Sequence, residues 1–216
     1  MNDSEVIFAK AREEQRLMAP QVISKDIPLD GENLVTGFDV SYSDSEAFAC
    51  AVTMDFSSMQ VVRTEKAVGR CEIPYVSGLF YLREGPIAID TLKRLGDMGH
   101  ILIDGNGVLH PRRCGLACYI GIKLDQPTIG VAKTLLMGQI GPRSGDLAEV
   151  RVGKEILGAA LWLSGSDRPV YISVGHKVSL ETAIQIVRDS SKSTYPEVLR
   201  LADSCSRFER EMQESK

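Results

Sequence analysis

Two aspartates lie where apolar residues predict buried β-strands. Asp39 lies within residues 35–41, and Asp104 ends the apolar run at residues 101–103. A buried carboxylate is costly unless it is paired or binds a cation. If the two strands are neighbours, both carboxylates can hold one hard cation such as Mg²⁺, which prefers oxygen ligands. Two simpler interpretations stand beside this one: Asp39 faces solvent on an edge strand, or Asp104 only begins a turn with Gly105.

Four more side chains of catalytic types follow the same pattern. Each lies beside a glycine, a proline or the end of an apolar run: Glu84, His110, Lys133 and His176. Residues of these types around a cation can polarise a phosphate and activate a water molecule. Taken singly, His176 is also explained as a strand-end histidine that caps a loop, and Lys133 as an exposed lysine.

The composition predicts an ordinary globular protein with a single domain over residues 1–216. Of the 216 residues, 44% are hydrophobic and 25% are charged, which is enough apolar material for one core. No apolar run approaches the roughly twenty residues of a bilayer span. The acidic N-terminal segment also lacks the order of a signal peptide. We therefore expect a cytoplasmic, monomeric protein that does not bind membranes.

The charge balance bears on the kind of partner. The formal net charge of −4 disfavours a protein that coats nucleic acid indiscriminately, because Lys and Arg drive phosphate binding. A local basic rim around an acidic site is compatible with that total.

The cysteines are odd in number and scattered along the chain: Cys50, Cys71, Cys114, Cys118 and Cys205. A disulfide framework would favour a short chain with regular pairing, so we expect all five to be reduced. Cys114 and Cys118 lie four residues apart on a predicted helix, without a second pair at zinc-site spacing. We interpret them as buried thiols.

One helix and three strands are predicted in the first third of the chain. The helix covers residues 5–18 and ends before Pro20. Residues 34–42 and 47–56 are runs rich in Val, Phe, Ala and Thr, and the polar stretch between them predicts an antiparallel hairpin. Residues 60–68 extend this hairpin to a meander.

Helices and strands alternate in the rest of the chain. The expected helices cover residues 78–98, 112–124 and 179–188, with a last one beginning at Pro196, and the expected buried strands cover residues 101–104, 128–132 and 170–174. This order indicates an α/β fold of the ribonuclease H-like kind, a mixed sheet flanked by helices.

Several short blocks resemble a known family in their order and spacing. The blocks are Gly37-Phe38-Asp39-Val40-Ser41, Pro74-Tyr75 with Glu84-Gly85-Pro86, Asp104-Gly105-Asn106-Gly107 with His110-Pro111-Arg112, and Gly130-Val131-Ala132-Lys133. Together they resemble endonuclease V, over nearly the whole chain from about Ala9 to Ile186. Agreement over several blocks is far more specific than one short motif.

The resemblance implies a metal-dependent nuclease site. Asp39 and Asp104 would bind Mg²⁺, with Mn²⁺ as a substitute, and Glu84 and His176 would complete the site directly or through water. The cation would polarise the scissile phosphate, while Glu84 or His176 positions or deprotonates the attacking water.

The resemblance also gives roles to three basic residues. Lys133 would contact the phosphate backbone or the departing oxygen, and His110 and Arg112 would contact phosphates.

A loop that acts as a wedge between bases is the next implied feature. The matching residues are Pro74 and Tyr75, with Tyr75 filling the space of an extruded base. Ser77 stands where the family has a second proline, so the loop lacks one fixed φ angle. The alternative interpretation of Tyr75 is a surface turn aromatic, which its place between Pro74 and Gly78 disfavours.

The resemblance places Gly78, Phe80, Gly105, Gly115 and Leu116 around the extruded base. Glycines let main-chain groups approach a base edge, which would recognise the O6 of hypoxanthine. Gly115 has an alternative interpretation as a glycine that permits close helix packing.

The implied function is DNA repair by hydrolysis of a phosphodiester bond on the 3′ side of deoxyinosine, leaving 3′-hydroxyl and 5′-phosphate ends. The expected partner is DNA that contains deoxyinosine or other deaminated bases. Two alternatives stay open: an endoribonuclease specific for inosine in RNA, and a module that binds lesions without cleavage.

Overall fold

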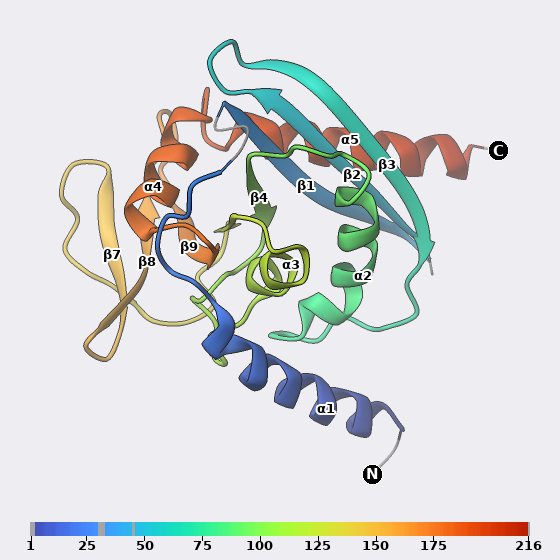
Figure 1. Cartoon of the computed structure of the whole chain (residues 1–216), viewed down its shortest axis with the longest axis horizontal. Coiled ribbons are helices and arrows are strands. Elements are labelled where there is room, and N and C mark those ends of the chain that lie inside the picture. Colours follow the sequence, from blue (N-terminus) through green and yellow to red (C-terminus); the bar gives the residue numbers. More distant parts are fainter. Residues whose placement is uncertain (1–2, 30–32, 45, 216) are drawn as a thin grey trace.

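The structure is a computed structural model, and it describes residues 3–29, 33–44 and 46–215. In these residues one mixed sheet has the strand order β3-β2-β1-β4-β5-β9-β8-β7-β6 (Figure 1). Its strands are β1 (Leu34–Ser43), β2 (Glu46–Asp55), β3 (Gln60–Arg70), β4 (His100–Asp104), β5 (Thr128–Ala132), β6 (Gln139–Ile140), β7 (Leu147–Val152), β8 (Glu155–Leu161) and β9 (Val170–His176). The helices are α1 (Asp3–Met18), the 3-10 helix η1 (Ala19–Gln21), α2 (Phe80–Leu92), α3 (Leu116–Leu124), α4 (Leu180–Asp189) and α5 (Glu197–Glu214).

The first three strands form the antiparallel meander that the sequence predicts. β1 pairs with β2 from Leu34↔Asp55 to Ser43↔Glu46, and β2 pairs with β3. Ser45, in the polar stretch between the first two strands, lies outside the described residues. The prediction of an α/β fold, with a mixed sheet flanked by helices, is confirmed.

The centre of the sheet is parallel. β1 pairs with β4 and β4 pairs with β5, both in parallel, whereas β9 returns antiparallel to β5. The carboxyl ends of parallel neighbours meet at one edge, where α/β sheets commonly bind ligands. That edge of this sheet contains the ends of β4 and β5.

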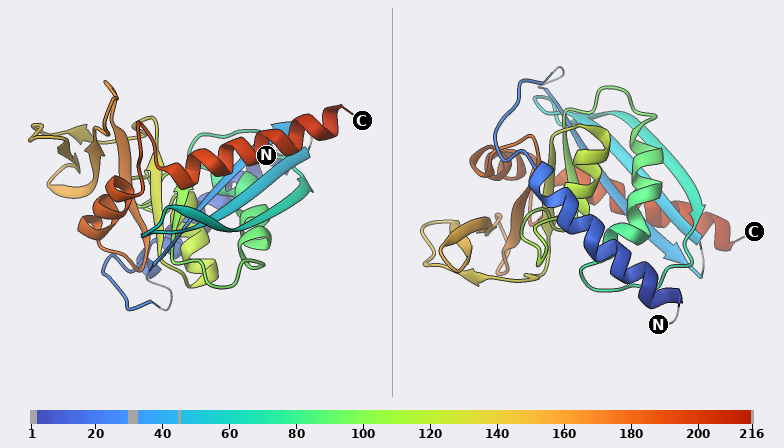
Figure 2. Two further views of the ribbon diagram at one scale, coloured as in Figure 1. Left: turned by 90° about the horizontal axis from the view of Figure 1, so that it is seen from above. Right: turned by 60° about the horizontal axis from the view of Figure 1, so that its bottom comes forward.

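Helices cover both faces of the sheet, as the two views in Figure 2 show. On one face, α4 and α5 pack over a core that includes Leu102, Val131 and Leu199. On the other face, α2 and α3 pack over Phe38 and Ile103. Among the helices of the described residues, none combines the length and apolar character that crossing a bilayer requires.

Helix α3 and the part of the sheet beyond β9 differ from the sequence prediction. The helix expected over residues 112–124 begins only at Leu116, because Arg113 has a φ of 56° and Gly115 is extended with a ψ of −170°. The strands β6, β7 and β8 were not predicted at all. They extend the sheet beyond β9.

The prediction that all five cysteines are reduced is wrong. Cys50 of β2 and Cys205 of α5 form a disulfide, although 155 residues separate them along the chain. The fold brings their Cα atoms to 6.0 Å, which is within the range of a disulfide. Cys114 and Cys118 are buried free thiols, as expected.

Candidate active site

Asp39 and Asp104 lie side by side on neighbouring strands. β1 and β4 pair in parallel up to Phe38↔Ile103, so the next step of the register aligns Asp39 with Asp104. Adjacent strands are about 4.8 Å apart. Side chains alternate between the faces of a strand, and both aspartates share the face that α5 covers. The alternative that Asp104 only begins a turn does not explain this alignment.

Burial and neighbouring acids both act on Asp39. Its carboxylate accepts a hydrogen bond from the Ser206 hydroxyl at 3.1 Å. Burial, followed by the charges of Asp104 and Asp203, raises the pKa of Asp39 to about 7. Such repulsion favours either proton uptake or a cation between the carboxylates.

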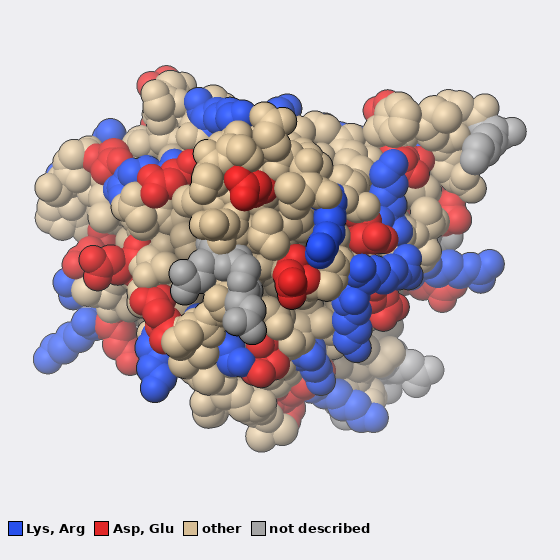
Figure 3. Space-filling view, turned by 45° about the horizontal axis from the view of Figure 1, so that its top comes forward, with Lys and Arg blue, Asp and Glu red and all other residues tan. Residues whose placement is uncertain are grey.

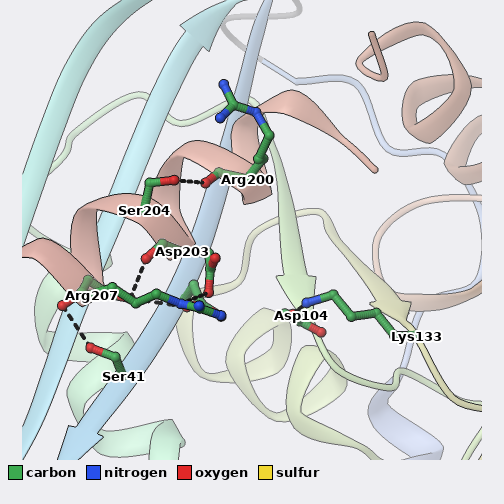
Figure 4. Close-up of polar contacts among 9 residues, drawn as sticks. Ser41, Asp104, Lys133, Arg200, Asp203, Ser204 and Arg207 are labelled. Carbon is green, nitrogen blue, oxygen red and sulfur yellow. Dashed lines mark hydrogen bonds and ion pairs between the residues drawn. The ribbon is translucent and has the colours of Figure 1, made fainter. Parts of the chain in front are cut away.

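Asp203 is an acid that the sequence analysis did not identify. It lies on α5, and Figure 4 shows it together with the Asp104–Lys133 pair at the end of β4. Its Oδ1 accepts from Arg207 Nε at 2.9 Å. The sequence signal is its helical spacing, because Asp203 lies four residues after the buried Leu199. An acid on the apolar face of a helix indicates a site.

Glu84 reaches the same cluster from α2, on the opposite side of the sheet. It is only 5% exposed, and its Oε1 accepts a hydrogen bond from the Tyr42 hydroxyl at 2.8 Å. The Arg83 guanidinium lies 3.8 Å from the centre of the Tyr42 ring. Burial, followed by the charges of Asp39 and Asp104, holds the pKa of Glu84 well above its usual range. The three predicted acids therefore act on one another.

Lys133 lies directly beside the aspartates. Its Nζ is 2.7 Å from Asp104 Oδ2, and its side chain is 59% exposed. The ammonium also lies 4.6 Å from the ring centre of Tyr195, a residue before α5 that the sequence analysis did not identify. Burial, followed by the charge of Asp104, raises the pKa of Tyr195. Lys133 thus has a defined place and is not a freely solvated lysine.

The structure does not bring His176 to this cluster, which corrects the prediction. β9 runs antiparallel to β5, and its last residue pairs with Thr128 at the start of β5, whereas Lys133 follows the end of β5. His176 Nδ1 accepts from the Ile23 backbone N–H at 3.3 Å, and Nε2 lies 3.7 Å from Asp125 Oδ1. His176 therefore lies at the opposite edge of the sheet.

A small cavity of about 70 Å³ opens next to the acids. The structure gathers there all five residues that were expected around a base, with six further lining residues. The lining residues are Gln15, Tyr75, Gly78, Phe80, Tyr81, Gly105, Asn106, His110, Gly115, Leu116 and Leu136. Because Gly105 directly follows Asp104, the cavity and the acid cluster share one edge of the sheet.

Tyr75 projects from the loop before α2. Its side chain is 66% exposed, and its ring meets the Phe80 ring edge-on with centres 5.7 Å apart. Gly78, three residues later, has a φ of +76°. Pro74 precedes Tyr75, so the exposed ring stands on a loop that is fixed at both ends.

His110 points inward, which corrects its prediction as a phosphate contact, whereas Arg112 bonds to the same segment and stays partly exposed. His110 is 2% exposed, with Nε2 lying 3.0 Å from the Gly78 carbonyl oxygen and Nδ1 accepting from the Arg112 N–H at 3.2 Å. Arg112 Nη2 donates to the same Gly78 carbonyl at 2.5 Å. With these groups engaged inside the protein, both residues support the cavity wall.

The acids fit a divalent cation in donor chemistry. Carboxylate oxygens are the ligands that Mg²⁺ prefers, and a cation here would offset the burial and the neighbouring charges that raise the pKa of Asp39. In the described part of the chain, however, no group of three or more His, Cys, Asp or Glu side chains is spaced closely enough to hold a metal. The Lys133 ammonium provides the positive charge at Asp104 instead.

The surface charge is mixed. Figure 3 shows Lys and Arg side chains interleaved with Asp and Glu side chains on one face of the molecule. No single sign covers that face, in keeping with the net charge of −4.

Comparison with known proteins gives consistent matches over most of the chain. The family model described as Endonuclease V matches residues 16–204. A relative called endonuclease V from Thermofilum pendens is 41% identical over 198 residues, which cover 89% of this chain and 84% of the relative.

Solved structures agree with this match. The crystal structure of endonuclease V from Streptomyces avermitilis has a TM-score of 0.85 and 37% identity, covering 96% of this chain and 93% of that one. Endonuclease V from Ciona intestinalis, in complex with a 24mer DNA that contains an inosine followed by a ribo-adenosine, has a TM-score of 0.86 and 28% identity. That alignment covers 98% of this chain and 100% of the other.

Proposed function

The chain belongs to the endonuclease V family, and we propose that it is a DNA repair endonuclease that cuts on the 3′ side of deoxyinosine with Mg²⁺ as its cofactor. The proposal is carried by one observation: the acid cluster and the small cavity lie on the same edge of the sheet, joined through Asp104 and Gly105. This arrangement puts a hydrolytic centre beside a site that can hold a base.

Asp39 and Asp104 would hold the cation, with Glu84 and Asp203 binding it directly or through water. Mg²⁺, or Mn²⁺ in its place, would polarise the scissile phosphate and lower the pKa of a bound water. Glu84 is suited to accept a proton from that water, because its own pKa is raised by burial. The products would be 3′-hydroxyl and 5′-phosphate ends.

Lys133 would balance charge near the phosphate. In the present arrangement its ammonium contacts Asp104. A cation bound to that carboxylate would compete with the ammonium, and the long flexible side chain could then turn to a phosphate oxygen. Tyr195 would keep the side chain close to the site during this change, through contact with its ring.

Tyr75 would fill the space that the extruded base leaves, and the cavity would bind the base. An exposed ring on a fixed loop is suited to stack in the space that an extruded base leaves. The glycines that line the cavity give main-chain groups access to the base edge, with Gly78 and Gly105 on different segments. Hypoxanthine, which has an O6 acceptor and no exocyclic amino group, is the expected ligand.

A second candidate function is cleavage of RNA that contains inosine. The observation in its favour is that the nucleic acid bound to the Ciona protein has a ribonucleotide after the inosine. A 2′-hydroxyl at that place can be read by a nuclease that prefers RNA. The two functions differ in the sugar, not in the base or the metal.

The test is to map nicks on end-labelled strands that carry one deoxyinosine or one inosine, with and without Mg²⁺. We expect a Mg²⁺-dependent nick on the 3′ side of the lesion and a preference for the deoxyinosine strand. A large preference for the RNA strand would favour the second function. No Mg²⁺-dependent nick on either strand would contradict both.

Substitution of Asp104 separates cutting from binding. Asp104→Ala should abolish nicking and leave much of the lesion binding, which fluorescence anisotropy measures in the absence of metal. Asp90→Asn is the matched control, because Asp90 is an exposed acid on α2 away from the cluster. Equal nicking by Asp104→Ala and the control would remove the proposed metal site.

A further inference from the structure

Gln15 is a buried polar residue on a helix whose other polar residues mostly face solvent. It is only 1% exposed, whereas Arg12, Glu13 and Arg16 of α1 are exposed. Both ends of its amide are bonded: Nε2 donates to the Cys114 carbonyl at 2.7 Å, and Oε1 accepts from Arg112 Nε at 2.6 Å. Gln15 also lines the small cavity. Its place is therefore more specific than helix packing requires.

The hydrogen bond with Arg112 connects Gln15 to the segment around Gly78, which forms the first wall of the cavity. Arg112, which donates to Gln15, also donates through Nη2 to the Gly78 carbonyl at 2.5 Å. His110 lies 3.0 Å from the same carbonyl oxygen. Gly78 has a φ of +76° and lines the cavity, so this carbonyl fixes the segment that carries Tyr75.

The hydrogen bond with the Cys114 carbonyl connects Gln15 to the segment around Gly115, which forms the other wall. Cys114 directly precedes Gly115, which lines the cavity and is the N-cap residue of α3. The Gly115 N–H donates to the Gly107 carbonyl at 3.0 Å, and a Cβ at Gly115 would lie 2.1 Å from the Asn106 carbonyl oxygen. This wall is close-packed backbone, and Gln15 holds its Cys114 carbonyl.

We propose that Gln15 and Arg112 form a tie between the two backbone walls, and that Gln15 thereby determines which purines the cavity accepts. The inference rests on the proposed function, which gives the cavity to an extruded base. In a cavity of about 70 Å³ a shift of either wall changes the fit of a single added atom. We expect a purine that carries one more atom, at C2, to fit less well between the tied walls than hypoxanthine does.

Xanthine is a suitable probe of this selectivity. Like hypoxanthine it presents an N1–H donor and an O6 acceptor, but it has one more oxygen, at C2. Xanthine also carries a hydrogen on N3, which hypoxanthine lacks. A preference between the two bases therefore reports on the fit of the C2–N3 side of the ring and not on the shared edge. Loss of the Gln15 amide leaves Arg112 Nε and the Cys114 carbonyl without their partner and releases the walls.

The experiment measures kcat/KM on single strands that carry one deoxyinosine or one deoxyxanthosine. The variants are Gln15→Ala, Gln15→Met, which keeps the length of the side chain but neither hydrogen bond, and Glu13→Gln as the control on the exposed side of α1. The ratio of the two kcat/KM values on one preparation does not depend on the folded fraction. Dissociation constants for both strands in EDTA provide a second readout without metal or cleavage.

We expect the hypoxanthine-to-xanthine ratio to fall by about tenfold in both Gln15 variants, and to stay at the wild-type value in Glu13→Gln. An equal loss on both strands, with the ratio unchanged, would overturn the inference and leave Gln15 a structural role only. If Gln15→Ala is too unstable to assay, Gln15→Met decides alone. Failure of the wild-type protein to nick either strand would instead contradict the proposed function, so the two failures are distinguishable.

Discussion

Replacement of His110 by glutamine should change how the stability of the protein depends on pH. In the structure, the Gly78 carbonyl oxygen can only accept, so His110 Nε2 carries the hydrogen, and Nδ1 accepts from the Arg112 N–H. If Nδ1 were protonated, its N–H would face the Arg112 N–H, and two donors would meet without an acceptor. Burial, followed by the charge of Arg112, lowers the pKa of His110 from 6.5 to about 4.

The direction and the size of the change in the free energy of unfolding follow from proton linkage. Between pH 6.5 and pH 4 the unfolded chain binds a proton at His110 that the folded protein does not bind, so the free energy of unfolding falls as the pH is lowered. A pKa of about 4 in the folded protein, against 6.5 in the unfolded chain, corresponds to about 3 kcal/mol of stability at neutral pH. All of this contribution is lost below pH 4. His110 is 2% exposed, so solvent screening reduces this value little.

The assay is urea unfolding of the wild type and His110→Gln from pH 7.5 to pH 4 in EDTA. Trp162, which packs against Arg143, serves as the fluorescent probe. Glutamine cannot take up a proton, and its amide can still donate to Gly78. Other titrating groups cancel in the difference between the two proteins. We expect the wild type to lose about 3 kcal/mol relative to the variant on acidification. Parallel curves for the two proteins would refute the assignment of the neutral ring.

Three further predictions concern the metal cluster, the disulfide and the sheet. Asp203→Asn should raise the Mg²⁺ concentration needed for half-maximal nicking by at least about tenfold, because a charged oxygen near Asp39 is lost; an unchanged Mg²⁺ titration would exclude Asp203 from the site. Reduction of Cys50–Cys205 should destabilise the wild type by about 2–5 kcal/mol in thermal melts with and without dithiothreitol, while the Cys50→Ala/Cys205→Ala protein should not respond. Gly130→Ala should cost at least about 2 kcal/mol in urea unfolding, because the added Cβ would lie 2.4 Å from the Gly107 backbone nitrogen; a smaller loss would mean that this loop can move away.

The strands that carry the two aspartates could be predicted because their apolar runs are continuous. The residues around Asp39 and Asp104 are buried in the structure, and each carboxylate stands out against its neighbours. Asp203 was missed because helix α5 contains many charged residues, and only its spacing from Leu199 distinguishes it. A helical projection of α5 would have identified it.

The position of His176 could not be predicted from its spacing. A strand-end histidine lies at the catalytic edge only if its strand runs parallel to β4 and β5, and β9 runs antiparallel to β5. The direction of a strand depends on the path of the chain between strands, which here includes β6, β7 and β8. Those strands did leave a signal: residues 147–152 alternate between buried and exposed, and Gly153 follows with a φ of +62° in a tight turn before Glu155.

The disulfide was missed for a different reason. Cys50 and Cys205 are 155 residues apart, and no spacing rule connects a strand of the meander with the last helix. Only the packing of α5 against β2 brings them together.

During translation, α5 leaves the ribosome after every other helix and strand described here. A chain interrupted before residue 197 would contain Asp39, Glu84 and Asp104 but not Asp203, and Gly37 of β1 would lack the backbone of Val198 that packs on it. Because the loss of α5 removes this packing on β1 as well as Asp203, we expect unfinished copies to be unable to nick, so the genome would meet an active nuclease only after α5 had been made.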